Sequence, residues 1–220
     1  MLFTEIRLKT HRPGELSEFY HEVLELTVST ETGSLSVTAG KSKIVFEKTD
    51  QYLNPFYHFA FNIPSNKFEE AYEWMQHKSE LLWLEDYKGN VADFVNWHAK
   101  SFYFLDPAGN ILEFISRFDL NDNVSEVFTS NLVRNVSEIG LVLPAEGFQN
   151  DVDNLLKKYP LPYFDKQPPL PQFKAIGDDE GLLIIVPENR VWFSTKMTES
   201  KIFPLSITFL QDGVSYQLNQ

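Results

Sequence analysis

The order of one strand, one helix and then several short strands recurs along this chain of 220 residues. The first repeat opens with an alternating strand over residues 2–10 and continues with a helix predicted over 13–24, because its apolar residues recur at i, i+3, i+4 and i+7. Short strands follow, separated by Gly33 and Gly40. An α+β fold built from βαβββ modules is therefore expected.

The second repeat follows the same order. It starts with a strand over 57–63 and continues with a helix over 67–77, for which Ser65 is the expected N-cap. Strands are predicted near 81–84, 101–105 and 111–116. The connection over 87–100 is long enough to be a lid or pocket rim.

The remainder of the chain contains a polar segment and a weaker repeat. Residues 119–133 are interpreted as a linker, which separates the paired modules of residues 1–118 from a third, degenerate module over 134–220. Its predicted strands are an opening strand near 137–144 and later ones near 182–186, 191–194 and 205–210.

The hairpin predicted over 101–114 places one carboxylate where a strand should be buried. The segment Asp106–Gly109 has proline early and glycine late, as a tight turn favours. Side chains alternate along a strand, so Glu113 shares a face with Ile111 and Ile115. A buried carboxylate is costly when unpaired, and Glu113 is expected to need a cation, a hydrogen-bond donor or a proton.

Composition excludes several classes of site. The net charge is −12 and the basic residues are scattered, so the sequence has no nucleic-acid footprint. There are no cysteines, so any metal must be held by His, Asp or Glu. Neither a signal sequence nor an apolar run approaching the ~18 residues of a membrane span is found, which predicts no membrane association and a cytoplasmic protein.

The repeats and two motifs resemble the vicinal oxygen chelate superfamily, which includes glyoxalase I, extradiol dioxygenases, fosfomycin-resistance enzymes and bleomycin-resistance binding proteins. The strand His58-Phe-Ala-Phe looks like the family's His-Ile-Ala-Phe strand, and Phe102–Phe114 looks like its Tyr-Phe-x-Asp-Pro-x-Gly-x-x-x-Glu hairpin. The motifs are most similar to those of fosfomycin-resistance metalloenzymes. The resemblance implies paired modules that form a curved mixed sheet with a central cleft, helices outside, and a divalent metal held by His58 and Glu113.

The resemblance also implies a third metal ligand, which in fosfomycin-resistance enzymes is a histidine at a fixed distance before a Phe-Tyr pair. Counting back from Phe19-Tyr20 gives Glu5 instead. His58, Glu113 and Glu5 would suit Mn²⁺, Fe²⁺, Ni²⁺ or Zn²⁺. Two alternatives stay open: Glu5 can pair with Arg7 or Lys9 on its own strand face, and Arg7 can hold a substrate carboxylate or phosphonate.

Two further residues are candidates for catalysis, each with a simpler interpretation beside it. Tyr103 can donate to a substrate oxygen, or it is a packing residue with a wet hydroxyl. His98 can act as a general acid or base, or it is a solvated loop histidine. In the third module, Glu138 stands where a first-strand ligand would, but the last strand has Ser206 or Thr208 in place of a glutamate, so no second metal is expected.

The predicted function is that of a metal-dependent enzyme acting on a small oxygen-bearing substrate, as a lyase, isomerase, epoxide-opening enzyme or dioxygenase. The alternatives are a metal-free small-molecule or antibiotic binding protein of the bleomycin-resistance type, and an interaction module with a decayed site. A homodimer is expected, because the third module has no fourth in the chain to pair with.

Overall fold

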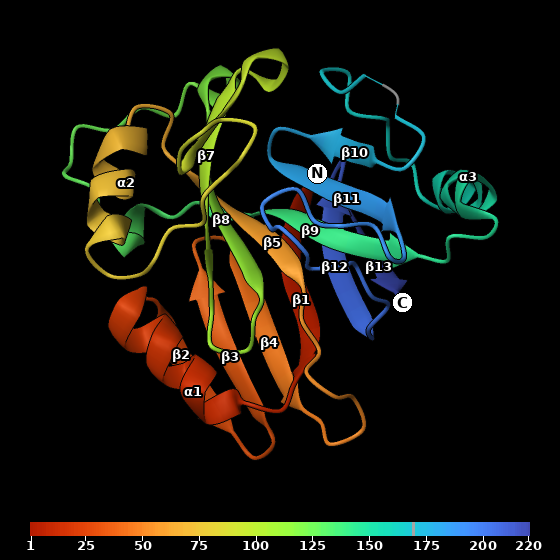
Figure 1. Cartoon of the computed structure of the whole chain (residues 1–220), viewed down its shortest axis with the longest axis horizontal. Coiled ribbons are helices and arrows are strands. Elements are labelled where there is room, and N and C mark those ends of the chain that lie inside the picture. Colours follow the sequence, from red (N-terminus) through yellow and green to blue (C-terminus); the bar gives the residue numbers. More distant parts are fainter. Residues whose placement is uncertain (169) are drawn as a thin grey trace.

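The computed structural model describes residues 1–168 and 170–220. The fold is α+β, as predicted, with two curved mixed sheets and the helices on the outside (Figure 1). In spatial order, the six-stranded sheet contains β13 (Val214–Asn219), β12 (Leu205–Gln211), β1 (Leu2–Thr10), β4 (Ser42–Lys48), β3 (Ser34–Ala39) and β2 (Thr27–Glu31). The seven-stranded sheet contains β10 (Lys174–Asp178), β11 (Gly181–Pro187), β9 (Asn135–Leu143), β5 (His58–Ile63), β8 (Ile111–Arg117), β7 (Ala99–Leu105) and β6 (Val91–Phe94).

The helices follow the first strand of each repeat. They are α1 (Pro13–Glu18), which continues into the π-helical turn η1 (Phe19–Val23), α2 (Phe68–Gln76) and α3 (Phe148–Lys158). Short 3₁₀ turns occur at η2 (Val95–Trp97), η3 (Phe118–Leu120) and η4 (Ser130–Leu132). None of the helices in the described part of the chain has the length and apolarity needed to span a bilayer.

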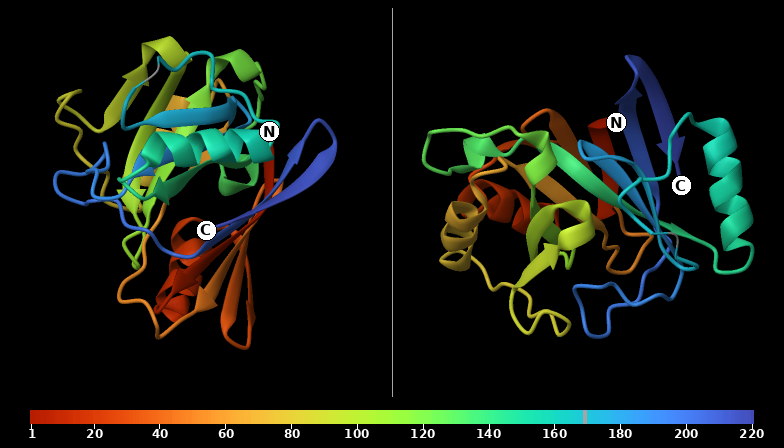
Figure 2. Two further views of the ribbon diagram at one scale, coloured as in Figure 1. Left: turned by 90° about the vertical axis from the view of Figure 1, so that its right-hand side faces the viewer. Right: turned by 90° about the horizontal axis from the view of Figure 1, so that it is seen from above.

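The repeats pair differently from the expectation. In the first two repeats the last strand lies parallel to the first, as β4 does to β1 and β8 to β5. However, β1 and β5 lie in different sheets, so the first and second repeats do not pair with each other as predicted. Instead β9 of the third repeat pairs antiparallel with β5, and β12 of the C-terminal hairpin pairs antiparallel with β1 (Figure 2).

This pairing removes the reason given above for a homodimer. The third repeat is already paired with the second through β5 and β9. The hairpin β12–β13 takes the corresponding place beside β1, where a fourth repeat would start. Dimerisation, and the division into 1–118, 119–133 and 134–220, stay predictions.

Alternation along the strands divides the interior into two apolar clusters. On β5, Phe59, Phe61 and Ile63 belong to the large cluster, whereas Ala60 belongs to a smaller one on the opposite face of the sheet. The smaller cluster consists mainly of residues from the seven-stranded sheet and from the loops in front of it. His58 shares the face of Ala60, which turns its imidazole away from the large cluster.

The predicted hairpin is present as β7 and β8, with the turn at Asp106–Gly109. Gly109 adopts a positive φ of 84°, which explains the glycine. The buried Asp106 carboxylate accepts hydrogen bonds from the backbone N–H groups of Ala108 and Asn110, from the Asn110 amide, and from the Tyr20 hydroxyl at 3.0 Å. The turn is thereby tied to the first helix.

Several local predictions are wrong. The Ser65 hydroxyl does not cap α2, whose N-cap is Lys67; it donates to Asp122 and to a backbone carbonyl. The segments 81–84 and 191–194 form only isolated bridges. Strands β6, β10 and β13 were not predicted, and β6 lies inside the connection interpreted as a lid. On β1, a bulge between Phe3 and Glu5 breaks the expected alternation, so Phe3 is buried.

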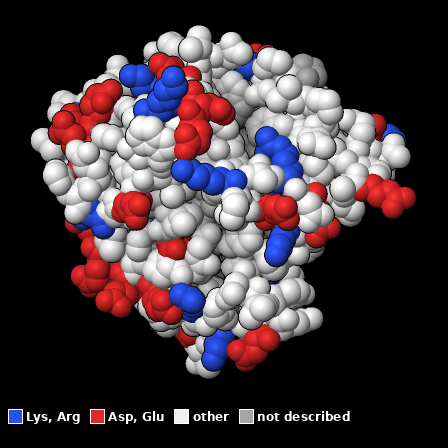
Figure 3. All heavy atoms as spheres, viewed as in Figure 1, with Lys and Arg blue, Asp and Glu red and all other residues white. Residues whose placement is uncertain are grey.

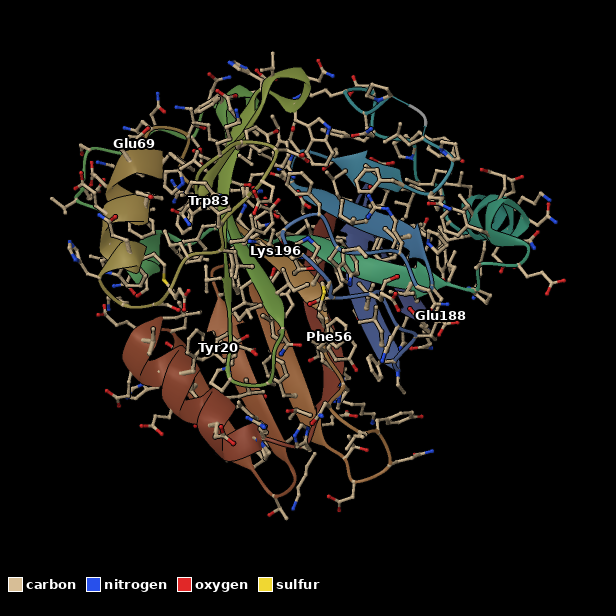
Figure 4. All side chains as sticks on the ribbon, in the orientation of Figure 1. Tyr20, Phe56, Glu69, Trp83, Glu188 and Lys196 are labelled. Atoms are coloured by element: carbon tan, nitrogen blue, oxygen red, sulfur yellow. The ribbon has the colours of Figure 1, made fainter. Side chains whose placement is uncertain are left out.

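Acidic and basic side chains are interspersed over the face shown in Figure 3, and neither sign forms a continuous area there. Many of them form ion pairs on the surface, such as Lys196 with Glu85 at 2.9 Å. This pair connects two loops, those that carry Trp83 and Lys196, in front of the central strands (Figure 4).

Candidate metal centre

One imidazole and two carboxylates meet on the cleft face of the seven-stranded sheet. Ala60 on β5 pairs with Glu113 on β8 at one side and with Glu138 on β9 at the other. These three positions form one row across the sheet, and His58 lies two residues before Ala60 on the same face. Three adjacent strands therefore bring His58, Glu113 and Glu138 together.

The ligand atoms of these three residues lie within 4.8 Å of one another. His58 Nε2 is 3.7 Å from Glu113 Oε2 and 3.9 Å from Glu138 Oε2. All three side chains are almost inaccessible to solvent, with 7%, 2% and 4% of their surface exposed. The cluster is thus a compact, desolvated group of potential metal ligands.

The surroundings of His58 favour the neutral imidazole with a free Nε2. Its Nδ1 is 3.1 Å from the carbonyl oxygen of Ile111, so Nδ1 carries the proton and donates it. Burial lowers the pKa of His58 from 6.5 to about 4. The lone pair of Nε2 consequently points toward the two carboxylates, and a carbonyl fixes the ring, as is usual for metal-ligating histidines.

The buried carboxylate of Glu113 is incompletely hydrogen-bonded. Its Oε1 is buried and has no hydrogen-bond partner in the described part of the chain. Burial, and the nearby charge of Glu138, raise the pKa of Glu113 well above its usual value. A buried carboxylate with an orphaned oxygen needs either a proton or a cation.

Glu138 differs because a cation already contacts it. The fully buried Arg117 donates from its Nη2 to Oε1 of Glu138, which leaves Oε2 facing His58. Burial still raises the pKa of Glu138, and Arg117 opposes that shift. Arg117 in turn lies over the Trp97 ring, 5.3 Å from its centroid, and 3.6 Å from Asp179.

The donor set fits a divalent cation. Two carboxylates and a neutral imidazole match the ligands of Mn²⁺, Fe²⁺, Ni²⁺ and Zn²⁺. The separations of 3.7 and 3.9 Å are close to the roughly 3.0–3.5 Å expected between neighbouring ligands of a metal with bonds of about 2.1 Å. The orphaned oxygen of Glu113 would also gain a partner. Arg117 opposes binding, because it adds a positive charge behind Glu138.

His58, Glu113 and Glu138 line a cavity of about 220 Å³. Its wall is rich in aromatic side chains, which include Tyr103, Trp97, Phe173, Trp192 and Phe193. The Trp192 ring packs on His58 with 5.2 Å between ring centroids. This packing requires a glycine at position 140, because a Cβ there would lie only 2.7 Å from the Trp192 ring.

Of the three predicted catalytic residues, Tyr103 lines the cavity, whereas His98 and Arg7 do not. Tyr103 pairs with Glu113 across β7 and β8, and its ring lies beside His58 at the cavity. His98 is 63% exposed and pairs with Asp119 at 2.7 Å, so it does not line the cavity. Arg7 is exposed and pairs with Glu5 at 2.7 Å and Glu47 at 3.0 Å.

Glu5 lies in the six-stranded sheet and does not join His58 and Glu113. In the first repeat Glu5 pairs with Lys43, as His58 pairs with Ile111 in the second. In the second repeat, Glu113 and Glu138 pair with Ala60, two residues after His58. Two residues after Glu5 is Arg7, and its partners are Val45 and Ser206, which are not metal ligands of this kind. Counting from the Phe-Tyr pair therefore selects a corresponding position, but in a sheet without the other ligands.

Glu138 is the member of the cluster that the sequence interpretation left out. Its first-strand position was recognised, but the third repeat was considered only together with its own last strand, which has Ser206 or Thr208 in place of a glutamate, so no metal site was expected there. Local sequence patterns gave no signal that β9 lies beside β5, because these two strands are far apart in the chain. Nothing in the sequence pattern singled out Arg117, Trp192 or Arg190, which reach the site through long-range packing.

The fold of this chain is similar to the folds of solved structures. A proposed dioxygenase from Bacillus subtilis aligns over 84% of this chain and 63% of its own length, with a TM-score of 0.56 and 14% identity. Glyoxalase I from Zea mays aligns over 84% of this chain and 66% of its own length, with a TM-score of 0.52 and 9% identity. No family model matches the sequence, and no curated protein matches it.

The chain therefore has the fold of the vicinal oxygen chelate superfamily. At these identities the similarity shows the fold alone. The chain spans slightly less than two thirds of the length of both proteins, so their activities are not transferred with the fold. The particular likeness to fosfomycin-resistance enzymes stays a prediction.

Proposed function

We propose that this protein is a metal-dependent enzyme in which His58, Glu113 and Glu138 hold one divalent cation and a small substrate binds in the adjoining cavity. The observation that carries the proposal is the convergence of a neutral imidazole and two carboxylates, one with an orphaned oxygen, in the lining of a mainly apolar cavity. When bound, such an ion supplies Lewis-acid activation of substrate oxygens. Lyase, isomerase and epoxide-opening reactions use this chemistry, and a dioxygenase reaction would in addition require a redox-active ion such as Fe²⁺.

The residues around the cluster have distinct tasks. The Ile111 carbonyl holds the His58 ring in place, and Arg117 holds one oxygen of Glu138. The Tyr103 phenol lies beside Glu113, and burial raises its pKa well above the usual value. Tyr103 therefore stays protonated and can donate a hydrogen bond to a substrate oxygen. The Trp192 ring covers His58 and excludes water.

A metal-free binding protein is the second candidate, and the ion pair between Arg117 and Glu138 favours it. In that case Arg117 neutralises Glu138, and Glu113 carries a proton because of its raised pKa. The aromatic cavity would then bind a small molecule without transforming it. Both candidates use the same cavity and differ in whether an ion binds.

Metal analysis distinguishes the two candidates. The protein is treated with a chelator, dialysed separately against Mn²⁺, Ni²⁺ and Zn²⁺, desalted, and its metal content measured beside the His58→Ala and Glu113→Ala variants. We expect about one ion per chain in the wild type and none in either variant. A wild type that holds no ion, and whose melting temperature does not change with any of the three metals, would refute the enzyme proposal and leave the binding protein.

A further inference from the structure

Arg190 is a cation at the cavity that forms no ion pair with a carboxylate in the described part of the chain. The other four arginines each pair with one: Arg7 with Glu5, Arg12 with Glu15, Arg117 with Glu138 and Arg134 with Asp122. No ion pair to Arg190 occurs among the described residues. Its backbone N–H donates a hydrogen bond to the Ser200 hydroxyl oxygen at 3.1 Å, which fixes the backbone at this point.

The position of the Arg190 side chain is set by the cavity wall. Its guanidinium carbon lies 5.4 Å from the centroid of the Phe173 ring, and both residues line the cavity that contains His58, Glu113 and Glu138. Stacking on an aromatic ring leaves the edge of the guanidinium plane free to donate hydrogen bonds. Burial lowers the pKa of Arg190, which reflects lost hydration. A partly dehydrated guanidinium gains most from an oxyanion partner.

The rest of the cavity restricts what the partner can be. Apart from the ligand cluster and Arg190, the wall consists mainly of aromatic and aliphatic side chains, such as Trp192, Phe193 and Ile184, with Gln167 and Ser194 as polar members. The volume of about 220 Å³ lies below the roughly 300–1,000 Å³ typical of sites for drug-sized ligands. The ligand is therefore a small molecule with an apolar body.

We propose that Arg190 binds an anionic oxygen group of the substrate, so that the substrate is a small organic acid, a carboxylate or a phosphonate, with a flat apolar body. The acid group contacts Arg190, the body packs between Trp192 and Phe173, and the opposite end reaches the ligand cluster. This inference names the substrate class for the proposed function. It rests on that function only where it places the far end of the substrate at the ligand cluster. Arg190 is thus the residue that selects anionic over neutral substrates.

Binding of three matched probes to metal-free protein tests the inference. Benzoate, phenylphosphonate and neutral benzamide have the same ring, and quenching of tryptophan fluorescence reports on binding, because Trp97 and Trp192 line the cavity. We expect the wild type to bind benzoate or phenylphosphonate at least about tenfold more tightly than benzamide, the loss expected for a charge-assisted hydrogen bond. The two acids distinguish a planar from a tetrahedral anion.

Three variants identify Arg190 as the cause. Arg190→Gln should lose the preference for the acids, and Arg190→Lys should keep part of it, since lysine retains the charge without the planar fork. Arg12→Gln is the matched control, because Arg12 is an exposed arginine remote from the cavity lining, and should behave as the wild type. Equal binding of benzamide and the acids, unchanged acid binding in Arg190→Gln, or binding of none of the probes would overturn the inference.

The outcome is independent of the metal proposal. The titrations use metal-free protein, so a preference for acids that requires Arg190 stands even if no metal binds. Conversely, Arg190→Gln should still take up one ion per chain in the metal analysis, because Arg190 is not part of the ligand cluster.

Discussion

Replacing Glu113 with leucine should stabilise the metal-free protein, although most substitutions in a protein core destabilise it. Glu113 is 1% exposed, and its Oε1 has no partner among the described residues. A buried unsatisfied acceptor costs about 1–3 kcal/mol, and leucine fills a similar volume without a polar atom. We expect the free energy of unfolding to rise by about 1–3 kcal/mol. For a chain of this length the melting temperature would rise by roughly 2–12 °C.

With metal added, the wild type should no longer be less stable than Glu113→Leu. At a free metal concentration of 100 times the dissociation constant, binding adds about 2.7 kcal/mol to the wild type and nothing to Glu113→Leu. Differential scanning calorimetry with and without Mn²⁺ measures both effects. Glu47→Leu is the control: this surface carboxylate pairs with Arg7 and Lys9, so its loss should change stability by at most about 1 kcal/mol in the unfavourable direction. Lower metal-free stability of Glu113→Leu, or equal stabilisation of variant and wild type by metal, would refute the reasoning.

Three further predictions concern the surroundings of the cluster. Burial lowers the pKa of His58 from 6.5 to about 4, so between these pH values the unfolded chain binds a proton at this histidine that the folded chain does not. As the pH drops from 6.5 to 4, the metal-free wild type should therefore lose roughly 3 kcal/mol of stability relative to His58→Leu in urea titrations, because the other buried titratable groups are common to both proteins. Gly140→Ala places a Cβ 2.7 Å from the Trp192 ring, so it should shift tryptophan emission and cost about 1–3 kcal/mol. Arg117→Met leaves Glu138 unpaired and should cost about 3–5 kcal/mol in urea denaturation, whereas an unchanged midpoint would show that the pair contributes nothing.

Local sequence patterns predicted the parts of the fold that depend on neighbouring residues. The turn at Asp106–Gly109 and the alternation that turns Glu113 away from the large core both follow from a few consecutive residues. The same holds for His58, whose strand was identified at its observed position. Turn chemistry and a period of two leave few alternatives over such short segments.

The pairing of the repeats could not be obtained in this way. Which first strand lies beside β5 depends on edge complementarity between segments far apart in the chain, and β9 occupies that edge. The choice of Glu5 over Glu138 as the third cluster member followed directly from this point. Arg117 could not be recognised either, since a strand residue at the end of β8 becomes fully buried only after β9 and its Glu138 are in place.

The identity of the third ligand is the central claim, and a titration of Mn²⁺ followed by electron paramagnetic resonance tests it most directly. The measurement compares the wild type with Glu138→Gln and Glu5→Gln, two substitutions of the same chemistry in different sheets. We expect Glu138→Gln to weaken Mn²⁺ binding by at least tenfold, and Glu5→Gln to bind as the wild type does. Weakened binding in Glu5→Gln with unchanged binding in Glu138→Gln would contradict the account.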